Sequence, residues 1–424
     1  MKIRRLELLS EEELSVILTR AGETLENVKT GVSEILSEIK KRGIVAVLEF
    51  TQKFDGVNLP SLEAPVEELE AVDESSVEFD FLRAAAQNIE KFHTNQFENV
   101  CAEKKIEIEK GVELWREWRS IESVGIYAPG GLATYPSSVL MQAIPARLAG
   151  CREIILATPP CKDGLIAKEV IAAAKIAGVT KIFKAGGAQA IGALAFVGKV
   201  QKITGPGNPW VTEAKAQIST EIPIDMPAGP SEILVLADIS ANARFVAADL
   251  LSQAEHASNS SAILVTTSAA LAEEVQAEVY QQLASLSRQK IAEKSLSDYG
   301  QILIAANLSS AIKFTNAYAP EHLEICTENP DIILPKIMNA GSVFLGNFAS
   351  ESAGDFATGS NHVLPTAGFA RNFSALSVES FGKKIQVQRI SREGLQKIRG
   401  ICEKFGEAEG LDAHTKSISI RFED

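Results

Sequence analysis

The sequence contains no clustered cysteines and no long apolar run. Its five cysteines are widely spaced and include no CxxC pair, so neither a zinc ribbon nor a disulfide framework is indicated. No apolar stretch approaches the length of a membrane span, and the basic start of the chain lacks the apolar segment of a signal peptide. We therefore expect a cytoplasmic protein without a membrane partner.

Basic residues are fewer than acidic ones, with 42 Lys and Arg against 55 Asp and Glu. The formal net charge is -13, which argues against nucleic acid as the main partner and suits a small cationic molecule. With 46% hydrophobic and 23% charged residues the composition is that of an ordinary globular protein. A length of 424 residues is enough for two or more domains.

The usual dinucleotide fingerprint, GxGxxG after a first strand, is absent. Glycines stand instead at the turns Gly130-Gly131, Gly186-Gly187 and Gly205-Pro206-Gly207. These turns could approach a pyrophosphate, but they are equally ordinary connections from a strand to a helix. The residues alone therefore do not predict NAD binding.

The residue pattern predicts an α/β fold with two Rossmann-like parallel sheets. Strand, glycine turn and helix recur four times in 127–230, which is typical of a parallel sheet with covering helices. A second run of this kind follows Pro227-Ala228-Gly229-Pro230, with strands at about 232–236, 262–266 and 301–305. Helical periodicity covers 11–50 and 81–99.

These elements predict a division into three parts. Residues 1–126 and 231–376 form one α/β domain with N-terminal helices, and residues 127–230 form the second. Residues 377–424 form a helical, charged tail with a possible edge strand at its end, at 418–421. The stretch 347–375 is rich in small polar residues and has little periodicity, and a loop of that length inside a compact chain is usually functional.

Only five histidines occur, and four of them have chemically suggestive neighbours. His93 is the exception, and we expect it on a helix surface. Gln253 and His256 are three residues apart at the end of a predicted helix, so their side chains share one face. Amide oxygen and imidazole nitrogen both suit zinc.

The remaining three histidines each follow an acidic residue. Glu321 and His322 are adjacent, and a carboxylate with an imidazole can remove a hydroxyl proton and activate water. Asp355 and His362 belong to a stretch whose glycines let a loop fold closely around a site. Glu409 and His414 lie near the C-terminus, where they serve a site only if the tail docks on another subunit. Each pair alone is more often a solvated surface feature, but together they favour one site assembled from scattered loops.

At these positions the chain resembles histidinol dehydrogenase, and the resemblance covers nearly the whole sequence. The stretches that carry it are GGAQAIGALAF at 186–196, GPGN at 205–208, MPAGPSEIL at 226–234, SQAEH at 252–256, APEHL at 319–323, ESAGDFATGSNHVLPT at 351–366 and EGLDAH at 409–414.

The resemblance implies zinc-dependent oxidation of L-histidinol to L-histidine through L-histidinal, with two NAD reduced, by a homodimer that exchanges its C-terminal tails. It implies Glu321 and His322 as the catalytic pair. The implied zinc ligands are Gln253, His256, Asp355 and, from the partner subunit, His414. The implied substrate contacts are Ser231, Gln253, His256, His322, Asp355, His362, Glu409 and His414. The implied NAD contacts are Tyr127, Gln189 and Asn208.

Two other functions are compatible with the residue pattern. A zinc hydrolase could use the same metal site, with Glu321 activating water against an amide or ester. A two-lobed binding protein could hold an amine between its α/β domains without stoichiometric zinc. NADH formation from histidinol distinguishes a dehydrogenase from the first, and a metal assay distinguishes it from the second.

Overall fold

The computed structural model of the chain describes residues 1–20, 26–130, 134–226 and 229–423. Gly131, Pro227 and Ala228, which belong to the predicted turns, lie outside the described residues. The chain divides into two compact units: Met1–Thr94 with Ile121–Phe381, and Asn95–Ser120 with Gly382–Asp424. Among the described helices, none is long and apolar enough to cross a membrane.

The first unit contains a six-stranded parallel sheet in the order β1-β10-β9-β8-β11-β12. Strands β8 and β9 are continuous buried apolar runs, as expected for parallel strands covered on both faces. The strands are β1 (Lys2–Arg5), β8 (Glu232–Ala237), β9 (Ser261–Thr266), β10 (Gln301–Ile304), β11 (His322–Cys326) and β12 (Ser342–Leu345).

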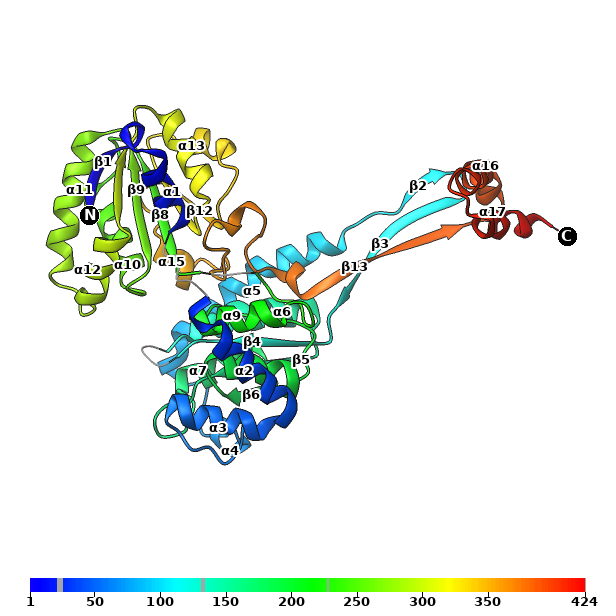
Figure 1. Cartoon of the computed structure of the whole chain (residues 1–424), viewed down its shortest axis with the longest axis horizontal. Coiled ribbons are helices and arrows are strands. Elements are labelled where there is room, and N and C mark those ends of the chain that lie inside the picture. Colours follow the sequence, from blue (N-terminus) through cyan, green and yellow to red (C-terminus); the bar gives the residue numbers. More distant parts are fainter. Residues whose placement is uncertain (21–25, 131–133, 227–228, 424) are drawn as a thin grey trace. The chain divides into compact units, whose positions relative to one another are not determined.

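Helices cover both faces of this sheet. Figure 1 shows α10, α11 and α12 along one face and α1 and α13 along the other, and each group packs with the strands into its own apolar core. The helices are α1 (Glu11–Thr19), α10 (Ala243–Ala254), α11 (Ala269–Leu283), α12 (Gln289–Asp298), α13 (Leu308–Tyr318), α14 (Pro330–Ile333) and α15 (Glu351–Phe356). Single 3-10 turns are η1 (Leu6–Leu8), η4 (Leu334–Lys336) and η5 (Phe369–Arg371).

The first unit also contains a four-stranded parallel sheet in the order β6-β5-β4-β7. Its strands are β4 (Ser123–Tyr127), β5 (Glu153–Thr158), β6 (Lys181–Lys184) and β7 (Ile203–Thr204). Its neighbouring helices are α2 (Glu26–Arg42), α3 (Ile44–Asp55), α4 (Val66–Glu70), α6 (Pro136–Ala149), α7 (Lys168–Ala177), α8 (Gly187–Gly192) and α9 (Pro209–Ile218), with the 3-10 turns η2 (Val77–Phe79) and η6 (Val378–Phe381) and the π-helical turn η3 (Ala193–Val197). Two parallel sheets with covering helices confirm the predicted fold class.

The second unit is built differently. Strands β2 (Ile106–Glu109), β3 (Val112–Ser120) and β13 (Gly382–Ile390) form an antiparallel sheet in the order β13-β3-β2, and helices α16 (Arg392–Ala408) and α17 (Asp412–Ser419) and the turn η7 (Ile420–Phe422) follow. Helix α5 (Asp80–Cys101) contributes residues to both units. The predicted tail, 377–424, therefore begins with the turn η6 of the first unit and continues with a strand before its helices. The predicted edge strand at 418–421 is wrong, because these residues continue the helical segment.

The N-terminal helices also differ from the prediction. The sequence assigned 1–126 as a whole to the domain with the six strands, but of the described elements in this range β1, η1 and α1 pack there. Helices α2 and α3 share the apolar core of the four-stranded sheet through Val32, Ile35 and Val47. The helical periodicity over 11–50 corresponds to three helices, α1, α2 and α3. Gly43, with φ of 59°, separates α2 from α3 in a backbone conformation that other residues rarely adopt.

Candidate active site

Several predicted site residues meet at the amino-terminal edge of the six-stranded sheet. His322 is the first residue of β11 and lies opposite Ile233 of β8. Gln253 and His256 lie at the C-terminal end of α10. A helix that connects two parallel strands runs antiparallel to the strands, so the C-terminus of α10 lies at the amino ends of the strands. This edge is opposite to the carboxyl edge where α/β proteins usually bind ligands.

Glu321 and His322 form the buried centre of this cluster. Helix α13 ends at Ala319, whose φ of 52° is left-handed, and Pro320 then prevents its continuation, so Glu321 and His322 enter β11. His322 Nδ1 lies 3.7 Å from Glu321 Oε2, and His322 Nε2 lies 3.5 Å from Asp355 Oδ1. The imidazole is therefore flanked by two carboxylates, one on each nitrogen.

Burial and charge act in opposite directions on these groups. Burial would lower the pKa of His322, but Glu321 and Asp355 raise it to about 10. Burial raises the pKa of Glu321 to about 8, against the opposing effect of His322. Burial would also raise the pKa of Asp355, but the hydrogen bond from His322 and the nearby His362 lower it to about 2. The two carboxyl groups on either side of the His322 ring therefore have widely different pKa values, as acid–base sites require.

A possible metal site lies beside His322. The ligand atoms of His256, Glu351 and Asp355 all lie within 4.8 Å of one another. Gln253 is completely buried, and neither atom of its amide has a hydrogen-bond partner among the described residues. A buried amide without a partner is costly unless a ligand satisfies it. Imidazole nitrogen, carboxylate oxygen and amide oxygen form a donor set that fits zinc.

Glu351 was not singled out by the sequence, although it lies four residues before Asp355 on α15. Ser252 Oγ of α10 donates to Glu351 Oε2 at 3.0 Å, while Glu351 Oε1 is buried without a partner. Burial and the neighbouring Asp355 raise the pKa of Glu351 to about 7. The i, i+4 spacing in ESAGD was the available signal, since it places both carboxylates on one helical face.

His362 lies on the segment that follows α15 and is partly buried. Its Nδ1 lies 3.0 Å from the Asp355 carbonyl oxygen, and its Nε2 lies 3.3 Å from Ser138 Oγ of α6. Ser231 immediately precedes β8 and is also partly buried. Ser138 gave no signal in the sequence, because 224 residues separate it from His362.

The two predicted site residues of the C-terminal tail lie in the second unit. Glu409 directly follows α16, and His414 belongs to α17. Both side chains are exposed. Within one chain, the group of metal-ligating side chains found in the described residues comprises His256, Glu351 and Asp355 and does not include His414.

The residues predicted to contact NAD lie near the carboxyl edge of the four-stranded sheet. Tyr127 ends β4, its hydroxyl accepts a hydrogen bond from the Gly187 amide at 3.3 Å, and burial raises its pKa to about 12. Gln189 of α8 donates to Asp55 Oδ2 at 3.1 Å. Asn208 caps α9 by accepting from the Val211 amide at 3.1 Å.

The turn after β7 approaches Tyr127 closely. A side chain at Gly205, where φ is 125°, would meet the Tyr127 carbonyl oxygen at 2.2 Å. Lys215 donates to the Gly205 carbonyl at 2.8 Å and pairs with buried Asp225, which accepts from the Gly205 amide at 2.7 Å. The order β6-β5-β4-β7 places the reversal of strand order between β4 and β7, the usual position of a ligand crevice in such sheets.

Comparisons with known proteins show which family the chain resembles. A family model described as histidinol dehydrogenase matches residues 18–422. The chain is 46% identical to a histidinol dehydrogenase of Methanosarcina mazei over 100% of this chain and 98% of that protein. It is 44% identical to the enzyme of Vibrio parahaemolyticus over 98% of this chain and 97% of the relative. The crystal structure of histidinol dehydrogenase from Elizabethkingia anophelis matches with a TM-score of 0.93 and 44% identity, over 99% of this chain and 97% of the other.

Proposed function

Because the chain belongs to the histidinol dehydrogenase family, we propose that it oxidises L-histidinol through L-histidinal to L-histidine, reducing two NAD, in the last steps of histidine biosynthesis. The observation that supports this chemistry best is the position of His322 between the carboxylates of Glu321 and Asp355. An imidazole in that position can take a proton from an alcohol and pass it on.

We propose Gln253, His256, Asp355 and His414 of the partner subunit as the zinc ligands. The unpartnered amide of Gln253 and the cluster of His256 with Asp355 support the first three. The exposed position of His414 in the second unit is compatible with a ligand offered to another copy in a homodimer. Glu351 lies beside this set, and its carboxylate adds negative charge that favours a bound cation.

When bound, zinc supplies a Lewis acid that fixes the imidazole and amino nitrogens of the substrate, and NAD supplies the hydride acceptor. In its neutral form, His322 removes the hydroxyl proton as the alcohol carbon loses hydride, and it then releases this proton to solvent. Glu321, as the carboxylate, activates the water that adds to the aldehyde, and the neutral His322 takes the proton of the resulting gem-diol as the second hydride leaves. Two hydride losses and one added water convert the alcohol to the acid.

The other predicted residues position the reactants. We propose that Ser231 and His362, with Glu409 of the partner subunit, contact histidinol, as do Gln253, His256, His322, Asp355 and His414 of the partner subunit. We propose that Tyr127, Gln189 and Asn208 contact NAD. The position of Tyr127 and Asn208 at the reversal of strand order, with Asn208 at the N-terminus of α9, supports this, because helix N-termini favour phosphate groups. Gln189 lies on α8, whose first residue, Gly187, donates to the Tyr127 hydroxyl.

The test is an assay of NADH absorbance with zinc-loaded protein, NAD and L-histidinol. Two NADH formed per histidine produced support the proposal. A zinc hydrolase would form none under these conditions, and a binding protein would form none and hold no stoichiometric zinc. The predicted cytoplasmic location is independent of this assay and stays a prediction.

A further inference from the structure

Arg20 and Glu232 form a buried ion pair, and Glu232 contacts the catalytic residues Glu321 and His322. We propose that Arg20 and Glu232 are positioning residues that hold Glu321 and His322 in their reactive places. The inference rests on the proposed function for its kinetic test, and on contacts within the first unit for its geometry.

Glu232 contacts both catalytic residues. Its backbone amide donates to Glu321 Oε2 at 2.8 Å, and the Glu321 amide donates to Glu232 Oε1 at 3.3 Å. The two residues are therefore joined by reciprocal hydrogen bonds, each between one backbone amide and the other carboxylate. Such a pair fixes the Glu321 carboxylate on the amino end of β8 rather than leaving it to rotate.

Glu232 also orients His322. The carbonyl oxygen of Glu232 lies 3.1 Å from His322 Nδ1, which must carry a proton to donate to it. Because Nδ1 keeps its proton for this bond, Nε2 is the nitrogen that gains and loses a proton, and it lies 3.5 Å from Asp355 Oδ1. The nitrogen that a general base needs is therefore selected by the backbone of Glu232.

The Glu232 carboxylate needs a counter-charge, because it is completely buried beside Glu321. Arg20, whose side chain is also buried, supplies it through an ion pair from Nε to Glu232 Oε2. The Tyr318 hydroxyl lies 3.2 Å from the same oxygen. Without Arg20, the buried carboxylate of Glu232 would lie beside that of Glu321 with no cation paired to it, and at least one of the two would have to move or take up a proton.

Arg20 also holds the chain that leads into the catalytic residues. Its guanidinium lies over the Tyr318 ring, 3.8 Å from the centroid, and donates to the Tyr318 carbonyl oxygen. Tyr318 is the last residue of α13, three residues before Glu321. Arg20 itself adopts φ of 62°, a conformation that a residue with a side chain rarely keeps without such fixed contacts.

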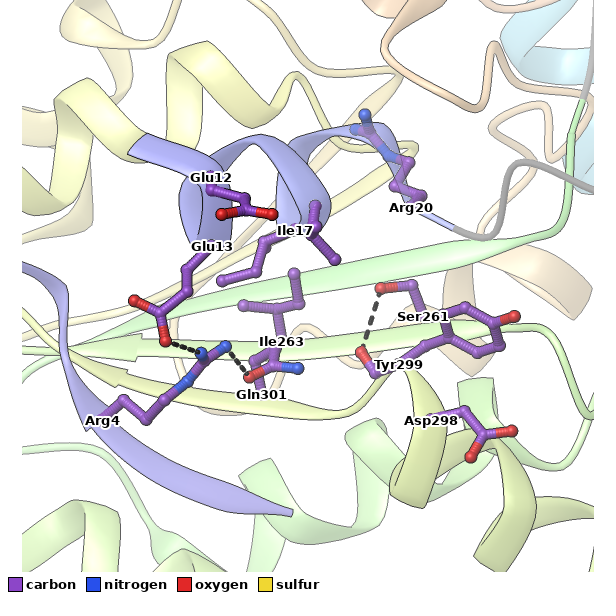
Figure 2. Close-up of a pocket in the computed structure, with 11 residues that line it drawn as sticks. Arg4, Glu12, Glu13, Ile17, Arg20, Ser261, Ile263, Asp298, Tyr299 and Gln301 are labelled. Carbon is purple, nitrogen blue, oxygen red and sulfur yellow. Dashed lines mark hydrogen bonds and ion pairs between the residues drawn. The ribbon is translucent and has the colours of Figure 1, made fainter. Parts of the chain in front are cut away.

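A second arginine on the same pocket provides a matched control. Figure 2 shows Arg4 and Arg20 on the lining of one pocket, with Arg4 directed toward Glu13 and Gln301. Arg4 donates to Gln301 at 2.6 Å and pairs with Glu13, and among the described contacts it makes none with Glu232, Glu321 or His322. Both arginines tie the N-terminal segment to the same sheet, but of the two only Arg20 contacts Glu232, which in turn bonds Glu321 and His322.

The kinetic experiment compares Arg20→Met, Arg20→Lys and Arg4→Met in zinc-loaded protein. A misplacement of about 1 Å can cost on the order of 100-fold in rate, so Arg20→Met should lose about that factor in kcat with little change in the KM for histidinol. Arg20→Lys should recover part of the loss, and Arg4→Met should keep kcat within about twofold. Equal effects of Arg20→Met and Arg4→Met on kcat and thermal stability would overturn the proposal.

A double-mutant cycle tests whether the effect passes through Glu321. If it does, adding Arg20→Met to Glu321→Gln should cost much less in histidinal oxidation than adding it to the native chain, whereas independent losses multiply. Multiplying losses overturn the proposal. If Arg20→Met does not fold, Glu232→Gln takes its place in the cycle, since it removes the ion pair with little change of shape.

Crystal structures of Arg20→Met, or of Glu232→Gln in its place, test the positioning of Glu321 and His322 without an activity assay. A displaced Glu321 carboxylate or a turned His322 ring supports the positioning role, and an unchanged pair of side chains refutes it. Failure of the native protein to form NADH from histidinol would instead reject the proposed function, while this structural comparison would still decide the role of Arg20 and Glu232.

Discussion

The side-chain amide nitrogen of Asn361 lies 3.4 Å from Nε2 of His93, although 268 residues separate them. His93 is completely buried in α5, and its Nδ1 lies 2.8 Å from the Ile89 carbonyl oxygen. Burial lowers the pKa of His93, so the neutral ring donates from Nδ1 and accepts at Nε2. The prediction of a surface histidine is therefore wrong: His93 helps to hold the residue next to His362.

Asn361→Ala should weaken both the fold and substrate binding. The Asn361 amide also donates to the Met141 carbonyl at 2.6 Å, and its oxygen accepts from the Val363 amide at 2.9 Å. Loss of these buried bonds should lower the free energy of unfolding by about 1–3 kcal/mol. Displacement of His362 should raise the KM for histidinol about tenfold, which corresponds to about 1.4 kcal/mol. Urea unfolding and steady-state kinetics measure the two effects.

The control for that variant is Asn99→Ala, because the Asn99 amide bonds only to Asn95 on an exposed face of α5. It should change stability by no more than about 0.5 kcal/mol and leave the KM unaltered. A KM for Asn361→Ala equal to that of the native chain would show that Asn361 does not position His362.

Gln253→Met should stabilise the metal-free protein while weakening zinc binding. The buried Gln253 amide has no partner among the described residues, so removing it should raise the metal-free free energy of unfolding by about 1–3 kcal/mol. The increase in melting temperature on adding zinc should shrink, since that increase reports binding to the folded state. Calorimetry with and without zinc measures both.

Gln142→Met provides the matched comparison. Gln142 is equally buried, but its amide donates to the carbonyls of Tyr127 and Ser138 at 3.0 and 2.8 Å. The same substitution should therefore destabilise at this position. If Gln253→Met destabilised the metal-free protein as much as Gln142→Met, the proposal that the Gln253 amide is a metal ligand without a partner in the metal-free protein would be refuted.

Glu321→Gln and His322→Asn should separate the two oxidation steps. Glutamine can still accept from the Glu232 amide, so the side chain should stay in place while its basicity is lost. Only aldehyde oxidation requires added water, so Glu321→Gln should slow histidinal oxidation more than histidinol oxidation. His322→Asn should slow both steps by about 10²–10⁴-fold. Single-turnover NADH formation from each substrate measures the difference, and a native rate with histidinal for Glu321→Gln would exclude the water-activating role.

Subunit exchange tests the shared site. A His256→Ala chain and a His414→Ala chain should each be inactive and lose zinc, while a mixed dimer should regain one site with His256 of one chain and His414 of the other. Zinc content, NADH formation and association should then be coupled. If proven mixed dimers stay inactive, the exchanged tail is refuted, whereas zinc ligation by His256 is unaffected.

Periodic local patterns made much of the first unit predictable. Strands β8, β9 and β10 are short, largely apolar runs, and they lie within a residue of the predicted positions 232–236, 262–266 and 301–305. Strands β11, β12 and β13 were not predicted. Strand β13 pairs with β3 more than 260 positions earlier in the chain, and no local periodicity reports such a partner.

The sequence by itself determined the family and the chemical character of the site, because SQAEH, APEHL and the stretch from Glu351 to His362 carry their acids, amide and imidazoles in fixed order. The tertiary structure alone decided what surrounds them. It placed Arg20 against Glu232, Ser138 beside His362 and His93 beneath Asn361, over separations of more than 200 residues. Each of these contacts depends on packing between distant segments, whereas a motif records only the residues next to one another along the chain.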